Sequence, residues 1–463
     1  MASAFLDAVL GVVDTQLDES LARLFELLRI ASISTDPAYA EDCGRAADWL
    51  AADLSADGFD ASMRPTAGHP VVVAHDRRGD GPHVLFYGHY DVQPIDPLEL
   101  WTTPPFEPAL ITTPDGKKRI VGRGTSDDKG QLMTFLEACR AWRRVAGHLP
   151  LKVSVLLEGE EESGSRNLAA FIDGAAAELK ADIALVCDTD MWDPQTPAIV
   201  TMLRGIVAEE FEVRTANKDL HSGMYGSAAR NPIQLIAEII ASLRTDEGAV
   251  AIAGYYEGVA EVPADVAARW TTLGFDARKF LADVGLSVPA GEKGRSVLEQ
   301  TWSRPTCEIN GIWGGYTGEG AKTVIPAKAR AKVTFRLVGD QNPEKLRQAF
   351  RSHVRARIPA DCSVKFFGGS ATPAVTVSSD GVHVRKALAA LKDEWGHEGV
   401  LIGSGGSIPV VMEFKQRLGL DTLLIGFAGH DDQIHSPNEK YDLASFHRGI
   451  RSWVRIIDAL AKP

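Results

Sequence analysis

Apolar and polar positions in the first 200 residues alternate between helical and strand-like spacing. Helical spacing covers LARLFELLRI, about 43–56 and about 130–146, and the last two segments end before Gly58 and at Gly147. Between and after them lie the apolar runs PVVVAH, HVLFYGHYD and LKVSVLLEGE, a helix in NLAAFIDGAAAEL and the strand ADIALVCDTD. Strands separated by helices of this length form parallel sheets covered on both faces. We therefore predict an α/β fold with a mixed, parallel-rich sheet flanked by helices.

The pattern changes at about Arg204. Strands VAEEFEVRT, CEINGIWG, ARAKVTFRLV and SVKFFGG and helices PIQLIAEIIASLR and PEKLRQAFRSHVRAR give the order β-α-β-β-α-β, interrupted by a long irregular insertion at about 245–314. That order is typical of a ferredoxin-like α+β domain. After it, α/β spacing returns. We predict a discontinuous first domain over 1–203 and 377–463, with the second domain inserted at 204–376.

Composition and charge narrow the class of protein. With 45% hydrophobic and 24% charged residues, the 463-residue chain has the composition of a soluble globular protein. Its formal charge of −13 argues against nucleic acid or an anionic membrane surface as a partner, because both require a basic surface. The amino terminus has no basic region before its short apolar run, and the five scattered cysteines form no disulfide framework. These features predict a cytoplasmic location.

Acidic residues and histidines follow successive predicted strands. The groups are His89 with Asp91, Asp127 with Asp128, Glu161 with Glu162, Asp188 with Asp190, and His430, Asp431, Asp432 and His435. Each group alone fits a solvated turn, a surface histidine or a helix cap. Together the groups indicate an active site, because active sites of such sheets form where the carboxyl ends of strands meet.

Histidine and carboxylate ligands without thiolates suit zinc, or manganese and cobalt. His89, Asp127, Glu162, Asp190 and His435 supply enough ligands for two ions if one carboxylate bridges them. A carboxylate left beside a water shared by the ions would act as a general base. The sequence therefore predicts a hydrolytic site with two divalent metal ions, most simply zinc.

Nine segments, in this order, resemble the motifs of a known family. They are GHYDVQP, GRGTSDDKGQ, LEGEEESGS, CDTDMW, NKDLHSGMYG, GAKTVIP, FRLV, GGSIPV and HSPNEK. The family is that of the dinuclear metallopeptidases, which includes carnosine dipeptidases, aminoacylase, glutamate carboxypeptidase and succinyl-diaminopimelate desuccinylase. The likeness runs from about residue 15 to the end and is greatest to the cytosolic non-specific dipeptidase branch.

The resemblance implies a role for each matching residue in the first domain. His89 and Asp190 would bind one metal, Glu162 and His435 the other, and Asp127 would bridge them. Asp91 would orient His89 through its second ring nitrogen. Glu161 would take a proton from the bridging water and return it to the leaving amine. The Asp127–Asp128 peptide bond would be cis.

In the inserted domain the resemblance implies residues that contact the substrate. His221 would reach the active site of a partner subunit and stabilise the oxyanion, which implies a homodimer formed through a lid and dimerisation domain. Arg336 would bind the terminal carboxylate of the substrate, and Thr323 and Ser407 would add hydrogen bonds.

These expectations favour a di-zinc enzyme that hydrolyses dipeptides. One alternative keeps the metal site but changes the substrate to an N-acyl amino acid, a carbamoyl compound or the carboxyl end of a longer peptide. A second alternative is a non-catalytic protein that binds a peptide or metabolite in the same cleft. Such a protein would be expected to lack a ligand or the general base, whereas all of these residues are present.

Overall fold

The computed structural model describes residues 5–462 and divides into two compact units. Unit 1 runs to Thr201 and also contains Val377–Ile402 and the chain from Pro409 onwards. Unit 2 contains Met202–Thr376 and Gly403–Ile408. The boundaries predicted near 204 and 376 lie close to these. The short segment 403–408 was placed in the first domain by the prediction, but it packs with unit 2.

A mixed sheet forms the centre of unit 1, with the strand order β1-β2-β6-β3-β7-β17-β8 and with β16 paired to β8. Strands β6, β3, β7 and β17 run parallel to their neighbours in this group, whereas β1, β2 and β8 pair antiparallel. The bounds are β1 Asp60–Arg64, β2 Val71–Asp76, β3 His83–His89, β6 Lys152–Glu158, β7 Ile183–Val186, β8 Ala198–Leu203, β16 Val400–Ser404 and β17 Thr422–Leu424. The predicted mixed, parallel-rich sheet is confirmed.

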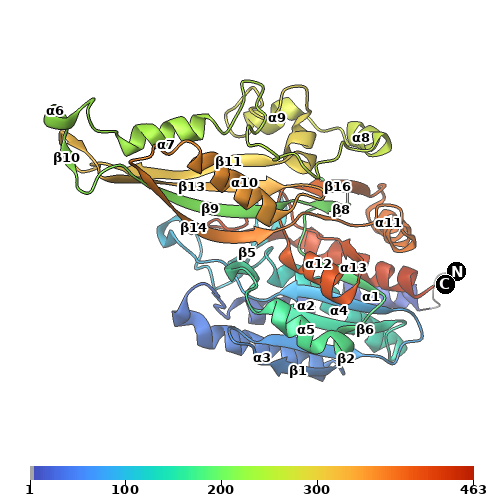
Figure 1. Ribbon diagram of the computed structural model, residues 1–463. Coiled ribbons are helices and arrows are strands. Elements are labelled where there is room, and N and C mark those ends of the chain that lie inside the picture. The colour runs from blue at the N-terminus through green and yellow to red at the C-terminus, as the bar shows by residue number, and fades with distance from the viewer. Residues whose placement is uncertain (1–4, 463) are drawn as a thin grey trace. The chain divides into compact units, whose positions relative to one another are not determined.

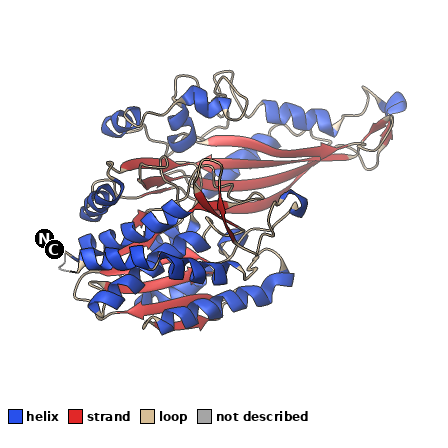
Figure 2. Cartoon of the chain, turned by 180° about the vertical axis from the view of Figure 1, so that it is seen from behind, coloured by secondary structure: helices blue, strands red, loops and turns tan. Residues whose placement is uncertain are grey.

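Helices cover both faces of this sheet (Figures 1 and 2). Their bounds are α1 Leu6–Thr15, α2 Leu17–Leu28, α3 Ala40–Ala56, α4 Lys129–Ala146, α5 Leu168–Leu179, α11 Val382–Trp395, α12 Pro409–Glu413 and α13 Leu443–Ala461. Neighbouring residues of β3 show the two faces, because side chains alternate along a strand. Phe86 stacks on Phe135 of α4 at 3.9 Å between ring centroids, whereas Tyr87 meets Phe414, after α12, at 5.9 Å. Burial on both faces explains why the strand is apolar throughout.

A second, three-stranded sheet in unit 1 was not predicted. Its order is β18-β5-β4, with bounds β4 Ala109–Thr112, β5 Lys118–Val121 and β18 Lys440–Asp442. It pairs Lys440 with Val121, so it joins two segments far apart in the chain. β18 depends on this long-range partner and has no local sequence signal, whereas β4 and β5 pair with each other across the local turn at 113–117. The sheet brings the segment that follows His435 beside the segment that precedes Asp127.

Unit 2 has the predicted β-α-β-β-α-β order. Its antiparallel sheet has the order β11-β13-β9-β14, and α7 and α10 pack on it through the apolar residues of one face. The bounds are β9 Gly205–Arg214, α7 Pro232–Ala241, β11 Thr306–Gly314, β13 Lys328–Leu337, α10 Pro343–Arg355 and β14 Ser363–Thr372. Buried and less buried residues alternate along β9 and β13, as expected of a sheet covered by helices on one face.

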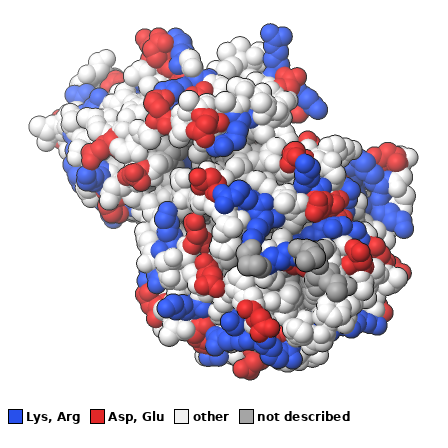
Figure 3. Space-filling model, turned by 90° about the vertical axis from the view of Figure 1, so that its right-hand side faces the viewer, with Lys and Arg blue, Asp and Glu red and all other residues white. Residues whose placement is uncertain are grey.

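Several shorter elements complete unit 2. They are β10 Leu220–His221, α6 Ser222–Tyr225, α8 Ala264–Thr271, α9 Ala277–Ala282, β12 Val324–Ile325 and β15 Val375–Thr376. The insertion at about 245–314, which was predicted to be irregular, contains α8, α9 and the whole of β11. Within the described part of the chain, no helix has the length and apolar character needed to cross a membrane. Basic and acidic side chains are interspersed on the face shown in Figure 3.

Candidate metal centre

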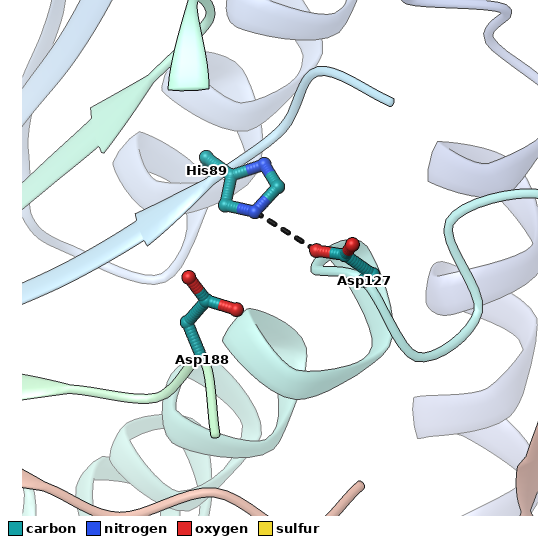
Figure 4. Close-up of side chains that lie close together, drawn as sticks. All are labelled: His89, Asp127 and Asp188. Atoms are coloured by element: carbon teal, nitrogen blue, oxygen red, sulfur yellow. Dashed lines mark hydrogen bonds and ion pairs between the residues drawn. The ribbon is translucent and has the colours of Figure 1, made fainter. Parts of the chain in front are cut away.

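Four side chains of unit 1 converge on Asp127: three lie at or after the ends of β3, β6 and β7, and the fourth lies in the loop between β17 and β18. His89 is the last residue of β3, and Asp188 follows β7. Potential ligand atoms of these three residues all lie within 4.8 Å of one another, and Figure 4 shows the three side chains facing a common point. This arrangement can hold one metal ion.

A second group shares Asp127 and adds Glu162 and His435, again with ligand atoms within 4.8 Å of one another. The Oδ1 atom of Asp127 lies 3.1 Å from Nε2 of His89, and its Oδ2 atom lies 2.9 Å from Nε2 of His435. Each oxygen of one carboxylate therefore faces a different histidine. This is the geometry that a carboxylate bridging two ions requires.

The structure places Asp188, and not Asp190, in the first group. Asp190 forms an isolated parallel bridge with Ala428, and its carboxylate lies 3.9 Å from Nδ1 of the exposed His430. Both aspartates follow the same strand and are two residues apart, so alternation along a strand cannot distinguish them. We therefore propose Asp188 as the ligand in place of the predicted Asp190, because Asp188 is the one grouped with His89 and Asp127.

The charges of the centre fit divalent cations. Burial raises the pKa of Asp188 and of Glu162, and it raises the pKa of Glu161 to about 7, with nearby carboxylates adding to the effect. Within the described residues, the Oε1 atom of Glu162 is buried without a hydrogen-bond partner. Buried carboxylates at this density repel one another unless a cation lies between them, and oxygen and imidazole donors suit zinc or manganese.

Both histidines interact with the carboxylates. Hydrogen bonds to Asp127 and Asp91 raise the pKa of His89 despite its burial, and hydrogen bonds to Asp127 and Glu162 raise the pKa of His435 to about 10. His435 also has a φ of 62°, in the left-handed region, which costs a non-glycine residue about 1–3 kcal/mol. Such a conformation is retained where the surrounding structure requires it, as at a binding site.

Asp91 contacts His89 and also the turn that carries Glu161 and Glu162. The Nδ1 atom of His89 lies 3.1 Å from the Asp91 carbonyl oxygen and 3.4 Å from its carboxylate. The same carboxylate accepts the backbone N–H groups of Glu161 and Glu162 at 3.2 and 3.0 Å. It also accepts the hydroxyl of Ser34 at 2.6 Å. Asp91 thus lies next to His89, and its carboxylate also binds the backbone of the two glutamates.

The predicted residues of unit 2 fall into two pairs. His221 belongs to the two-stranded ladder of β10 and β12, beside Thr323, whose carbonyl accepts the N–H of Ser222 at 3.0 Å. At a separate place in unit 2, Nη1 of Arg336 donates to Oγ of Ser407 at 3.1 Å. His221 is exposed, and its Nδ1 accepts the N–H of Gly223 at 3.0 Å.

Comparison with known proteins gives the family of the chain. The model of peptidase family M20/M25/M40 matches residues 85–459. The chain belongs to this family. The Cys-Gly metallodipeptidase dug1 of Schizosaccharomyces pombe is 30% identical over 474 residues, which cover 98% of each chain. The Beta-Ala-His dipeptidase of Rattus norvegicus is 26% identical, over 99% of this chain and 96% of the relative.

Solved structures of the family have the same fold. The dipeptidase Dug1p from Saccharomyces cerevisiae superposes with a TM-score of 0.85 at 26% identity, over all of both chains. An M20 family metallo-carboxypeptidase from Sulfolobus solfataricus superposes with a TM-score of 0.86 at 31% identity, over 96% of this chain and 99% of that one.

Sequence analysis of this M20 peptidase missed several polar residues around the centre. Gln93 donates from Nε2 to Glu162 at 2.7 Å, and Glu439 binds the loop that carries Asp127. Both lie inside motifs quoted above, two residues after Asp91 and four after His435, so their position was the available signal. The Asp127–Asp128 peptide bond is cis, as the resemblance implied.

In unit 2, the sequence analysis did not single out Arg204, which lies beside the predicted residue Ser407. Its Nε donates to the carbonyl of Gly405 at 3.1 Å, and its own carbonyl accepts the hydroxyl of Ser407. Burial, together with the charge of Arg336, lowers the pKa of Arg204 to about 10. Two arginines therefore lie near Ser407, where one was expected. No sequence pattern singled out the second.

Proposed function

We propose that this M20 peptidase hydrolyses the amide bond of dipeptides with a free carboxyl end, using two divalent metal ions, most simply zinc. The observation that carries the proposal is the pair of ligand groups that share Asp127. His89 and Asp188 would hold one ion, Glu162 and His435 the other, and Asp127 both. When bound, the two ions lower the pKa of a shared water and polarise the scissile carbonyl.

Glu161 is proposed as the general base. Burial keeps its pKa at about 7, near the value at which a carboxylate can both accept and return a proton at neutral pH. Its carboxylate would take a proton from the attacking water and deliver it to the leaving amine. The N–H of Glu161 is bound by Asp91, which holds the turn carrying both glutamates in place.

Residues of unit 2 are proposed to recognise the substrate. Arg336 would bind the carboxylate of the dipeptide, with Ser407 holding the guanidinium, because a planar guanidinium matches a carboxylate with two parallel hydrogen bonds. His221 would act on the oxyanion in the active site of a partner subunit, with Thr323 beside it. Its exposure, and that of Met224, which is 76% exposed, supports a contact made by this end of unit 2.

A carboxypeptidase acting on longer peptides is the second candidate, favoured by the 31% identical metallo-carboxypeptidase. An N-acyl amino acid deacylase would also have to bind the terminal carboxylate of its substrate.

The homodimer, the choice of metal and the cytoplasmic location also stay predictions.

One experiment tests the function. Protein stripped with a chelator receives zinc, manganese or cobalt singly and is assayed on dipeptides, matching tripeptides and N-acetyl amino acids. We expect dipeptides to be cleaved fastest and cleavage to require metal. Glu161→Gln should lower kcat by about 10²-fold or more while retaining the metal. Faster cleavage of tripeptides or N-acetyl amino acids would replace the dipeptidase assignment by one of the alternatives.

A further inference from the structure

Glu439 is a fully buried carboxylate that binds the loop carrying the bridging aspartate. Its Oε1 atom accepts the backbone N–H groups of Ser126 at 2.9 Å and Asp127 at 3.0 Å. Its Oε2 atom accepts the N–H of Gly124 at 2.9 Å and the guanidinium of Arg123 at 2.8 Å. Both oxygens are therefore saturated by donors from the segment 123–127, which we call the bridging loop.

Asp432 binds the same loop at a second point. Its Oδ2 atom accepts the hydroxyl of Ser126 at 2.7 Å and the N–H of Gly429 at 2.7 Å. Lys440 lies 2.6 Å from the other oxygen of Asp432 and compensates its charge. Two carboxylates from the segment 429–440 thus hold the bridging loop. This segment also contains His435.

These contacts fix Asp127 at its backbone while its side chain faces both histidines. The N–H of Asp127 is bound to Glu439, and the two carboxylate oxygens of the same residue point to His89 and His435. Asp127 and His435 are 308 residues apart in sequence, so their relative position depends on contacts of this kind. A shift of either segment would change the separation of the two ligand groups.

We propose that Glu439, with Asp432, is a positioning residue of the metal centre. It joins the loop of the bridging ligand to the segment of the histidine ligand and so sets the distance between the two metal positions. The inference rests on the proposed function in that Asp127 and His435 are taken as ligands. It is independent of which peptide is cleaved.

The charge of the carboxylate is essential to this role, because four donors surround it. In Glu439→Gln, one oxygen is replaced by an NH₂ group that must face either Arg123 and Gly124 or Ser126 and Asp127. A donor would then point at donors, although the side chain keeps its size. The bridging loop must move away on one side, and the ligand groups with it.

Binding of cobalt to the metal-stripped enzyme tests the proposal. Titration calorimetry and the visible absorption of bound cobalt report the affinity and the ligand geometry without any peptide substrate. We expect Glu439→Gln to weaken cobalt binding about 10–100-fold, the usual effect of removing a partner of metal ligands, and to change the absorption spectrum. In the dipeptidase assay kcat should fall while KM changes little.

Glu394 provides a matched control in the same unit. Its side chain is 4% exposed and accepts Arg451 at 2.7 Å and Arg455 at 2.9 Å, and none of these residues belongs to the ligand groups. Glu394→Gln should lower the urea midpoint but leave cobalt affinity and spectrum unchanged. If Glu439→Gln behaves like this control, the positioning role is wrong.

Ser126→Ala gives a second test should Glu439→Gln fail to fold. It removes the hydroxyl bound by Asp432 and leaves the backbone contacts to Glu439 in place. We expect several-fold weaker cobalt binding with little loss of stability. Unchanged cobalt binding in this variant would contradict the proposal. A wild-type enzyme that binds cobalt but cleaves no dipeptide would refute the proposed function alone.

Discussion

At the scale of single residues, the centre depends on which acid of a closely spaced pair faces inwards. Asp188 lies with His89 and Asp127, whereas the half-buried Asp190 lies 3.9 Å from the exposed His430. Asp91 and Gln93 are also two residues apart, and both contact the glutamate turn. Two residues at positions i and i+2 therefore lie on the same side of the chain only while the chain stays extended.

Substitution of the two aspartates separates their roles. Asp188→Asn should lower kcat/KM by about 100-fold or more, since even partners of metal ligands cost about 10–100-fold when removed, and it should weaken binding of one metal ion. Asp190→Asn should stay within a few-fold of wild type, because its half-buried carboxylate lies outside both ligand groups and its contact with the exposed His430 is a surface pair, worth about 0–1 kcal/mol. Steady-state kinetics and metal analysis of both purified variants measure this. Loss of one metal ion in Asp190→Asn but not in Asp188→Asn would restore the original assignment.

At the scale of helices and strands, local patterns predicted the elements that carry the centre. The helix expected at about 130–146 is α4, Lys129–Ala146, and Gly147 ends it with a φ of 79°. Apolar strands ending in His89 and Glu158 were expected from their composition and are β3 and β6. β18 and the contacts of Glu439 were missed because both depend on pairing across more than 300 residues. The hairpin of β4 and β5 is local, and the turn residues Asp115 and Gly116 between its strands were an available signal that was not used. The hydrophobic periodicity of a segment predicts which of its faces is buried, but it does not predict which distant segment packs against that face.

The contact between β2 and α4 gives a prediction for stability. Asp76 ends β2, and its buried carboxylate accepts Nη2 of Arg143 in α4 at 2.6 Å and Nε of Arg78 at 2.9 Å. Asp76→Asn should lower the free energy of unfolding by about 3–5 kcal/mol, as expected when one partner of a buried ion pair is removed. Urea denaturation at pH 7 measures the difference. A loss below about 1 kcal/mol would mean that the pair contributes no more than a surface ion pair.

The same carboxylate predicts the pH dependence of that difference. Hydrogen bonds from Arg78 and Arg143 lower the pKa of Asp76 to about 2, although burial opposes the shift. A group with a lowered pKa in the folded state stabilises the protein above its ordinary pKa, near 3.9, and loses this effect as the pH falls towards 2. The stability difference between wild type and Asp76→Asn should therefore be constant from pH 7 to about 5 and shrink between pH 4 and 2.

At the scale of the whole molecule, the proposed dimer places residues of two chains in each active site. Unit 1 contains both ligand groups and Glu161, whereas His221 and Arg336 belong to unit 2. Exposed apolar side chains of unit 2 include Ile312, 49% exposed, and Trp313, 43% exposed, both on the edge strand β11. An edge strand with apolar side chains is a surface that a second copy can cover.

Mixing two inactive variants tests whether His221 acts across such a dimer. His221→Ala and Glu161→Gln should each be nearly inactive alone. In a mixed dimer, the His221→Ala subunit keeps Glu161 and receives His221 from its partner, so one of the two sites is complete. Random exchange of equal amounts yields half mixed dimers, and about a quarter of the wild-type activity should return. The assay follows dipeptide hydrolysis after the variants are denatured and refolded together, with separately refolded variants as the control. If His221 instead served its own subunit, every site in the mixture would retain one defect, and no activity would return.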